Sequence, residues 1–168
     1  PVVTIDRTNA ADSAILFTTF FTSFTFDFAL RQSLGGTSVS KYILKQLPMP
    51  TPETVSELAV SNNEVEESLD QFLLKRGLKL LWTSHSLDSL GEESSVDLDG
   101  PITWEQSERR TLRAEIDAVI AQVYGLDKNE FSRIIDSFDI LRDQEEEEYG
   151  EYRRKRECLE MFDQIEVK

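Results

Sequence analysis

Seven side chains that can contact DNA lie within the short segment from residue 31 to residue 46. They are Arg31, Gln32, Thr37, Ser38, Lys41, Lys45 and Gln46. Arginine, lysine and hydroxyl side chains bind backbone phosphates, and glutamine can form two hydrogen bonds with adenine in the major groove. The alternative is a solvated loop edge, in which Arg31 and Gln32 only cap the helix before it. The segment therefore predicts a DNA contact or a plain surface loop, and both interpretations stay open.

The elements around this segment must hold it at the surface. A double glycine at residues 35–36 ends the apolar run before it, because glycine adopts positive φ without strain. Residues 42–47 are predicted to form a short strand, and three prolines at 48–52 prevent its continuation as a central strand. We expect the run over 12–34 to form one long, buried helix rich in phenylalanine.

The C-terminal third of the chain has the clearest helical periodicity. Thr103 and Gln106 are predicted to form a capping box at the start of a helix that ends near Gly125. A second helix is predicted to begin at Asp127, and a third is predicted to have the glutamates at 145–148 in its first turn. Three amphipathic helices with short connections predict a compact bundle.

Together these elements predict a mainly α fold with a small β element. It consists of a phenylalanine-rich buried helix, a short strand and a C-terminal helical bundle. We divide the chain into residues 1–52, residues 53–100 with a polar linker, and the bundle at 101–168. The middle segment is expected to contain a helix over 65–80 that is broken or bent near Gly77.

Charge is distributed unevenly along the 168 residues, whose net charge is −14. Four basic and three acidic residues give residues 1–50 a net charge of +1, so the remainder carries −15. Phosphate binding requires lysine and arginine, and we therefore expect any DNA-binding face in the first third. The basic residues at 153–156 follow the glutamates at 145–148. We mainly expect acidic and basic side chains one helical turn apart to neutralise each other, and phosphate binding by the basic residues is the lesser alternative.

Other kinds of chemistry find little support in the sequence. Cys158 is the single cysteine, which rules out an intramolecular disulfide and fits a reducing cytoplasm. His85 is the single histidine and supports neither a metal site nor a catalytic triad. Charged and hydroxyl side chains interrupt the apolar residues at 14–30, so we expect no membrane span. No basic leader precedes these residues, so we also expect no signal peptide. We expect no catalytic residue, metal or cofactor in this chain.

Two blocks of sequence occur in an order that is typical of one family. The first contains Arg31, Gln32, Gly35, Gly36, Thr37 and residues 44–48, and the second contains residues 112–117, 124–126, 135–138 and 148–153. They resemble the end of the target-recognition region and the C-terminal region of bacterial adenine-specific DNA methyltransferases from type II, type IIG-like, restriction-modification systems. Ser33 stands where that family usually has a basic residue, which puts one phosphate contact in doubt.

This resemblance implies a parent enzyme that transfers a methyl group from S-adenosylmethionine to adenine N6, and whether it also cleaves DNA stays open. The chain lacks the glycine-rich turn and the Asn-Pro-Pro-Tyr type motif that such catalysis needs. The resemblance therefore implies a non-catalytic fragment that contacts double-stranded DNA through its first third and scaffolds the parent's other domains. The alternative is an acidic helical module for protein-protein interaction or oligomerisation, including a homodimer through an exposed apolar helix.

Overall fold

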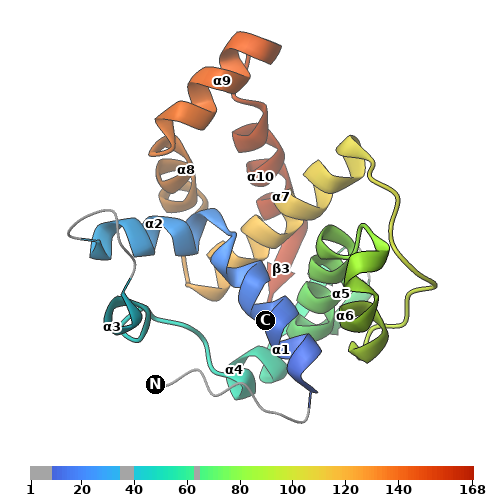
Figure 1. Ribbon diagram of the computed structural model, residues 1–168. Coiled ribbons are helices and arrows are strands. Elements are labelled where there is room, and N and C mark those ends of the chain that lie inside the picture. Colours follow the sequence, from blue (N-terminus) through green and yellow to red (C-terminus); the bar gives the residue numbers. More distant parts are fainter. Residues whose placement is uncertain (1–8, 35–39, 63–64) are drawn as a thin grey trace.

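The computed structural model describes residues 9–34, 40–62 and 65–168, which form helices around one small antiparallel sheet (Figure 1). The predicted fold class, mainly α with a small β element, is confirmed. The first half contains α1 (Ala10–Phe21), α2 (Phe24–Ser33), α3 (Lys41–Leu44), α4 (Pro52–Glu57), β1 (Ala59–Asn62), β2 (Val65–Ser68) and α5 (Leu69–Leu81). The second half contains the 3-10 helix η2 (His85–Leu87), α6 (Asp88–Glu93), α7 (Gln106–Val123), α8 (Lys128–Asp136), α9 (Asp139–Tyr149), α10 (Arg153–Gln164) and β3 (Ile165–Val167).

The phenylalanine-rich segment forms two helices, so the prediction of one continuous helix over 12–34 is wrong. α1 and α2 meet at a bend of 72°. Ser23 has an extended backbone between them, and its hydroxyl accepts a hydrogen bond from the N–H of Phe26 at 3.3 Å. The N–H of Phe24 donates to Asp117 at 3.0 Å, so both contacts stabilise a new helix start. Among the described residues, no single helix has the length and apolar character to cross a bilayer, and α1 and α2 meet these criteria only as a bent pair.

Residues 42–47 do not form the predicted strand. Lys41–Leu44 form the single helical turn α3, which lies below α2 in Figure 1. The Ser40 hydroxyl accepts a hydrogen bond from the N–H of Ile43 at 3.3 Å, as a helix-capping serine does. Local capping therefore favours a helical turn over an extended segment here.

The small β element comes from other parts of the chain. The strand order is β2-β1-β3, and both pairings are antiparallel. Val60 of β1 is buried and lies opposite Glu67 of β2 and Val167 of β3. The C-terminal strand therefore closes against a strand from the first half of the chain.

The middle helix differs from its prediction both in where it starts and in its course at Gly77. α5 begins at Leu69 because Val65 belongs to β2, so the helix predicted over 65–80 starts too early. α5 also continues through Gly77, which is buried against α1. A Cβ atom at this position would lie 2.3 Å from the Thr19 hydroxyl oxygen and 2.9 Å from Ile15 Cγ2. Gly77 therefore permits close packing of two helices and does not bend one.

The ends of the C-terminal helices confirm two predictions and correct a third. Gly125 has a φ of 72° just after α7, and α8 follows Asp127, both as expected. Asp127 also forms a capping box with Glu130. The predicted cap at Thr103 is wrong, because Glu105 caps α7. Its carboxylate accepts hydrogen bonds from two backbone N–H groups of the first turn, at 2.6 and 3.1 Å. The side chain of Glu105 is longer than that of a threonine and reaches these N–H groups. Its negative charge also interacts favourably with the positive end of the helix.

The glutamates at 145–148 lie in the second half of α9, so their predicted place at a helix start is wrong. α9 ends at Gly150, whose φ of 75° is left-handed. The backbone N–H of Arg154 donates to Glu145 at 2.6 Å. The predicted last helix is thus divided into α9 and α10, and one glutamate of the run helps to connect them.

α7 is the central element of the core (Figure 1). Its residues Ile116, Val119 and Ile120 pack in a cluster with Phe20, Val60 and Phe72. Its alanines Ala114, Ala118 and Ala121 pack in a second cluster with Phe24, Phe131 and Cys158. Ile15, Leu74, Leu78, Trp82 and Val96 form a third. Each cluster joins buried residues from at least two of the three predicted segments, and the first cluster joins all three.

Candidate functional site

The residues predicted to contact DNA are spread around the end of α2 and the turn of α3. Arg31, Gln32, Lys45 and Gln46 are exposed. Thr37, Ser38 and the side chain of Lys41 lie outside the described residues. The Arg31 guanidinium donates to Asp27 at 2.7 Å and lies 4.5 Å above the Phe138 ring. Within the described part of the chain, no hydrogen bond joins the four exposed candidates to one another.

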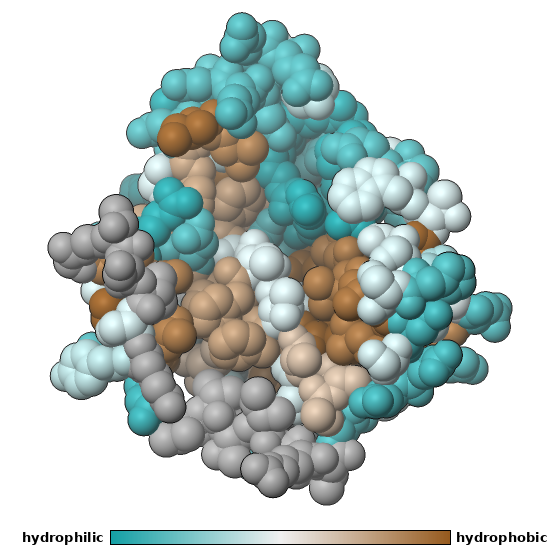
Figure 2. Space-filling model, in the orientation of Figure 1, coloured by the Kyte–Doolittle hydropathy of each residue, from teal (hydrophilic) through white to brown (hydrophobic). Residues whose placement is uncertain are grey.

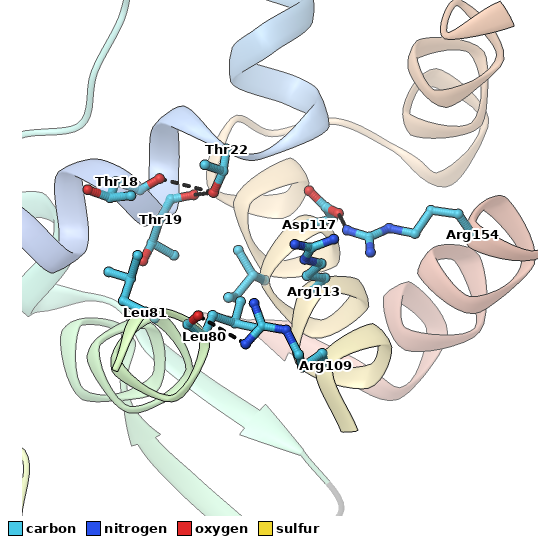
Figure 3. Close-up of a pocket in the computed structure, with 11 residues that line it drawn as sticks. Thr18, Thr19, Thr22, Leu80, Leu81, Arg109, Arg113, Asp117 and Arg154 are labelled. Atoms are coloured by element: carbon cyan, nitrogen blue, oxygen red, sulfur yellow. Dashed lines mark hydrogen bonds and ion pairs between the residues drawn. The ribbon is translucent and has the colours of Figure 1, made fainter. Parts of the chain in front are cut away.

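A different group of basic side chains meets in a pocket of about 330 Å³ between α1, α5, α7 and α10 (Figure 3). Its polar lining consists of Thr18, Thr19 and Thr22 on α1, Arg109, Arg113 and Asp117 on α7, and Arg154 on α10. The three α7 residues are four positions apart and share one helix face. Three arginines and one aspartate give the lining a net charge of +2, in a chain whose net charge is −14.

Asp117 and Arg154 form the buried ion pair at one end of this pocket. The two side chains are 2% and 13% exposed, and Nη2 of Arg154 donates to Oδ2 of Asp117 at 2.6 Å. Oδ1 of Asp117 accepts from the N–H of Phe24 at 3.0 Å. Burial raises the pKa of the Asp117 carboxyl, and the Arg154 charge and the Phe24 N–H oppose that rise. This pair fixes α2 and α10 to α7, so its first role is structural.

Arg109 and Arg113 have a different environment from Arg154. The Arg109 guanidinium donates to the carbonyl of Leu80 at 3.0 Å and lies 3.7 Å from the centre of the exposed Trp104 ring. Arg113 is exposed to solvent and forms no ion pair or hydrogen bond within the described residues. Burial of part of its side chain lowers the pKa of Arg113, and the nearby charges of Arg154 and Arg109 lower it further. The pocket therefore holds positive charge that the described carboxylates do not neutralise.

The corner between α9 and α10 positions Arg154. Its left-handed residue is Gly150, and the Tyr152 hydroxyl donates to the carbonyl of Ile135 at 3.2 Å. The basic side chains that follow are each paired: Arg153 with Glu157, Arg154 with Asp117, Lys155 with Asp136, and Arg156 with Glu151 and Glu160. Their carboxylate partners differ from the glutamates at 145–148 that the sequence suggested. Residues 148–151 of this corner are exposed and residues 152–153 are half-buried, so ion pairs and one hydrogen bond hold it against the fold.

Sequence reasoning did not identify Arg109 and Arg113 as part of a site. Their spacing along the chain was the available signal. Two arginines one turn apart, followed one turn later by an aspartate among apolar residues, indicate a polar strip that enters the core. Arg154 belonged to the basic run for which phosphate binding was the lesser alternative.

Metal ligands do not gather in the described residues, where no group of three histidine, cysteine, aspartate or glutamate side chains has suitable geometry. Cys158 is fully buried and its sulfur lies 3.9 Å from Asp117, while His85 is exposed and contacts Asp88 at 3.1 Å. No protein-family model matches this chain, and neither a curated protein nor a solved structure matches it. Residue chemistry and geometry are therefore the grounds on which a function is proposed.

Proposed function

We propose that this chain is the non-catalytic C-terminal part of a bacterial adenine-specific DNA methyltransferase from a restriction-modification system. In this proposal it works in the cytoplasm, contacts double-stranded DNA through residues 31–46 and holds the other domains of the enzyme in place. Methyl transfer from S-adenosylmethionine takes place in those other domains. The chain itself supplies neither catalytic residues nor a cofactor site.

One observation carries this proposal: the two blocks that resemble the family differ in exposure. The first block has its described polar residues, among them Arg31, Gln32 and Gln46, on the surface. The second is partly exposed at its end but has six buried residues, and its Tyr152 hydroxyl donates to the carbonyl of Ile135 in α8. The buried residues are Leu112, Ala114, Ile116, Asp117, Ile135 and Phe138. Exposed amide and basic side chains suit contacts with DNA, whereas packed residues suit a scaffold.

Local charge supports DNA contact at the first block. Residues 1–50 have a net charge of +1 within a chain of −14, so phosphates meet the least repulsion there. Lys45 and Gln46 are exposed just after α3. Arg31 pairs with Asp27 at a site where the two side chains are 57% and 35% exposed, so a phosphate can compete for its guanidinium.

The surface of α1 and α2 supports the scaffold role. Figure 2 shows apolar surface in the middle of the face where these helices lie, while the surface of α9 at the top is mostly hydrophilic. The partly exposed rings of Phe17 and Phe21 stack with centroids 4.2 Å apart. In the proposed parent enzyme, another domain covers this apolar surface.

The salt dependence of DNA binding tests this function. A mixed-sequence duplex is titrated at several salt concentrations with the wild type, with Lys41→Ala/Lys45→Ala, and with the control Lys75→Ala/Lys128→Ala. Each lost phosphate contact lowers the slope of log affinity against log salt by about 0.9. Because Lys41→Ala/Lys45→Ala removes two contacts, we expect its slope to be smaller than that of the wild type by about 2. The control removes the same charge from α5 and α8 and should bind as the wild type does. Absence of wild-type binding, or equal losses in both variants, would contradict the proposal.

The second candidate is an acidic helical module that binds a protein partner or a second copy of itself. Two large apolar side chains favour it, because Tyr42 is 71% exposed and Ile140 is 77% exposed. Light scattering after gel filtration tests self-association through such residues. A dimer that persists in Lys41→Ala/Lys45→Ala and dissociates in Tyr42→Ser, in a chain that binds no DNA, would favour this alternative.

A further inference from the structure

The basic side chains of α7 and α10 divide into two groups. Five of them pair with carboxylates: Arg110, Arg153, Arg154, Lys155 and Arg156. Arg109 and Arg113, one turn apart on α7, form no ion pair among the described residues. A chain with 32 acidic residues has many ways to neutralise two arginines. Unneutralised neighbouring arginines repel one another, and a bound anion would remove that repulsion.

One backbone group of the pocket, the Leu80 carbonyl, accepts a hydrogen bond from Arg109, and the pocket's other polar groups leave Arg113 without a partner among the described residues. Asp117 is the acidic residue of the lining, and its two oxygens accept hydrogen bonds from Arg154 and from the N–H of Phe24. The hydroxyls of Thr18 and Thr22 donate to carbonyls of their own helix, at 2.8 and 3.0 Å. The α1 wall is therefore polar and uncharged.

Arg154 has one donor that is unpaired but shielded from solvent. Its Nε is buried and has no hydrogen-bond partner among the described residues, although its Nη2 holds Asp117. Figure 3 shows the Arg113 side chain on the same side of α7 as this ion pair, with Arg109 one turn away. The volume of about 330 Å³ lies at the lower end of the range of roughly 300–1,000 Å³ for small-molecule pockets. The pocket thus combines positive charge, the unpaired donors of Arg113 and room for a small group.

We propose that this pocket binds a phosphate group through Arg109, Arg113 and Arg154. A guanidinium group presents parallel N–H donors that match two phosphate oxygens, and charge-assisted bonds of this kind are the strongest hydrogen bonds in proteins. The net charge of +2 of the lining matches a phosphate monoester dianion, and it also attracts a phosphodiester. The phosphate group belongs either to a small phosphorylated compound or to the backbone of DNA.

The site is independent of the proposed DNA contact at residues 31–46. Its arginines come from α7 and α10, and its walls come from α1 and α5. Failure of the Lys41→Ala/Lys45→Ala experiment would therefore leave this inference intact. Failure of the experiment below would equally leave the proposed function intact.

Thermal unfolding in inorganic phosphate tests the site. The wild type, Arg113→Gln and the control Arg133→Gln are compared in phosphate and in chloride at equal ionic strength. Arg133 is an exposed residue of α8 without an ion pair among the described residues, so the two variants remove the same charge. At a phosphate concentration about ten times the Kd, we expect the Tm of the wild type and of Arg133→Gln to rise by about 3–6 °C. We expect no such rise in Arg113→Gln.

Behaviour without phosphate separates a binding role from a structural one. Arg113→Gln removes like-charge repulsion, so its Tm in chloride should equal or exceed that of the wild type. An arginine with a structural role would instead lower the Tm when it is replaced. The proposal would be overturned if Arg113→Gln had a lower Tm than the wild type in chloride and its Tm still rose in phosphate as much as that of the wild type.

Duplex DNA titrations with the same variants identify the source of the phosphate. If the DNA backbone enters the pocket, Arg113→Gln lowers the salt slope of binding by about 1 and Arg133→Gln leaves it unchanged. If DNA binding is unaffected while inorganic phosphate still stabilises the wild type, the ligand is a small phosphorylated compound. The inference is overturned if neither the response to phosphate nor DNA binding depends on Arg113.

Discussion

The chain has two groups of basic side chains, and they differ in how the fold arranges them. Arg31 and Lys45 near α2 and α3 are exposed, and no described hydrogen bond joins them. Arg109, Arg113 and Arg154 line one pocket with a net charge of +2. The first group is recognisable as a stretch of sequence, whereas the second exists because four helices meet.

This difference shows what local sequence and tertiary structure each contribute to a binding surface. Scattered exposed cations act mainly through the long-range field, which attracts a polyanion and weakens with salt. Convergent guanidinium groups can hold one compact anion with defined geometry. The two regions are therefore expected to respond differently to mutation.

The largest expected effect is the loss of stability when Arg154 is replaced. Arg154→Met leaves Asp117 buried at 2% exposure without its ionic partner. Removal of one partner of a buried pair costs about 3–5 kcal/mol, and urea unfolding measures the loss. Arg156→Met on the same helix removes an exposed arginine and should have little effect. Equal losses in the two variants would show that the buried pair contributes nothing particular to stability.

A smaller loss is expected when the wall between α1 and α5 is crowded. Gly77→Ala places a Cβ atom 2.3 Å from the Thr19 hydroxyl oxygen. Overpacking costs about 1–3 kcal/mol, which exceeds the gain of at most about 1 kcal/mol from better helix propensity. Thr19→Ala removes the clashing oxygen, so the same glycine substitution should cost less in that background. A stabilised Gly77→Ala would contradict the close packing beside the pocket.

Tyr124→Phe tests how the segment after α3 is attached to the bundle. The Tyr124 hydroxyl donates to the carbonyl of Pro48 at 2.6 Å, and its loss should cost about 1 kcal/mol. Burial raises the pKa of Tyr124 from 10.0 to about 12. Between these pH values the unfolded chain loses a proton that the folded chain keeps, so this tyrosine makes wild-type stability fall as the pH rises. Urea unfolding across this range should show a smaller fall in the variant, and an equal fall would contradict the assignment.

The smallest effect on stability is expected in the exposed region. Lys45→Ala and Gln46→Ala alter exposed side chains and should change the free energy of unfolding by no more than about 0.5 kcal/mol. DNA affinity is expected to fall in the same variants. A large loss of stability would show that these residues serve the fold, which would remove the contrast with the pocket.

The accuracy of sequence reasoning followed the range of the interactions involved. The left-handed Gly125 and the helix start at Asp127 are local, and both were predicted correctly. The break between α1 and α2 depends in part on Asp117, 93 positions from Phe24, so the helical pattern over 12–34 did not predict it. β1 pairs with β3 from the end of the chain, and such pairing leaves no local signal.

The candidate sites likewise could be predicted only where their residues are close together in the sequence. The sequence identified the basic and amide residues near α2 and α3 because they are neighbours in the chain. It did not identify the pocket, because Thr18, Arg113 and Arg154 are brought together only by folding. The spacing of Arg109, Arg113 and Asp117 was the sole local sign of this pocket.

The most direct test of the contrast between the two regions is a nuclear magnetic resonance titration of the arginine side chains. Inorganic phosphate is added to the ¹⁵N-labelled chain, and the Nε–H signals of individual arginines are followed after assignment by mutation. We predict saturable shifts for Arg109, Arg113 and Arg154, and only small linear changes for Arg31. Shifts of equal size at Arg31 and Arg113, or no saturable shift in the pocket, would contradict the claim that the fold builds a phosphate site there.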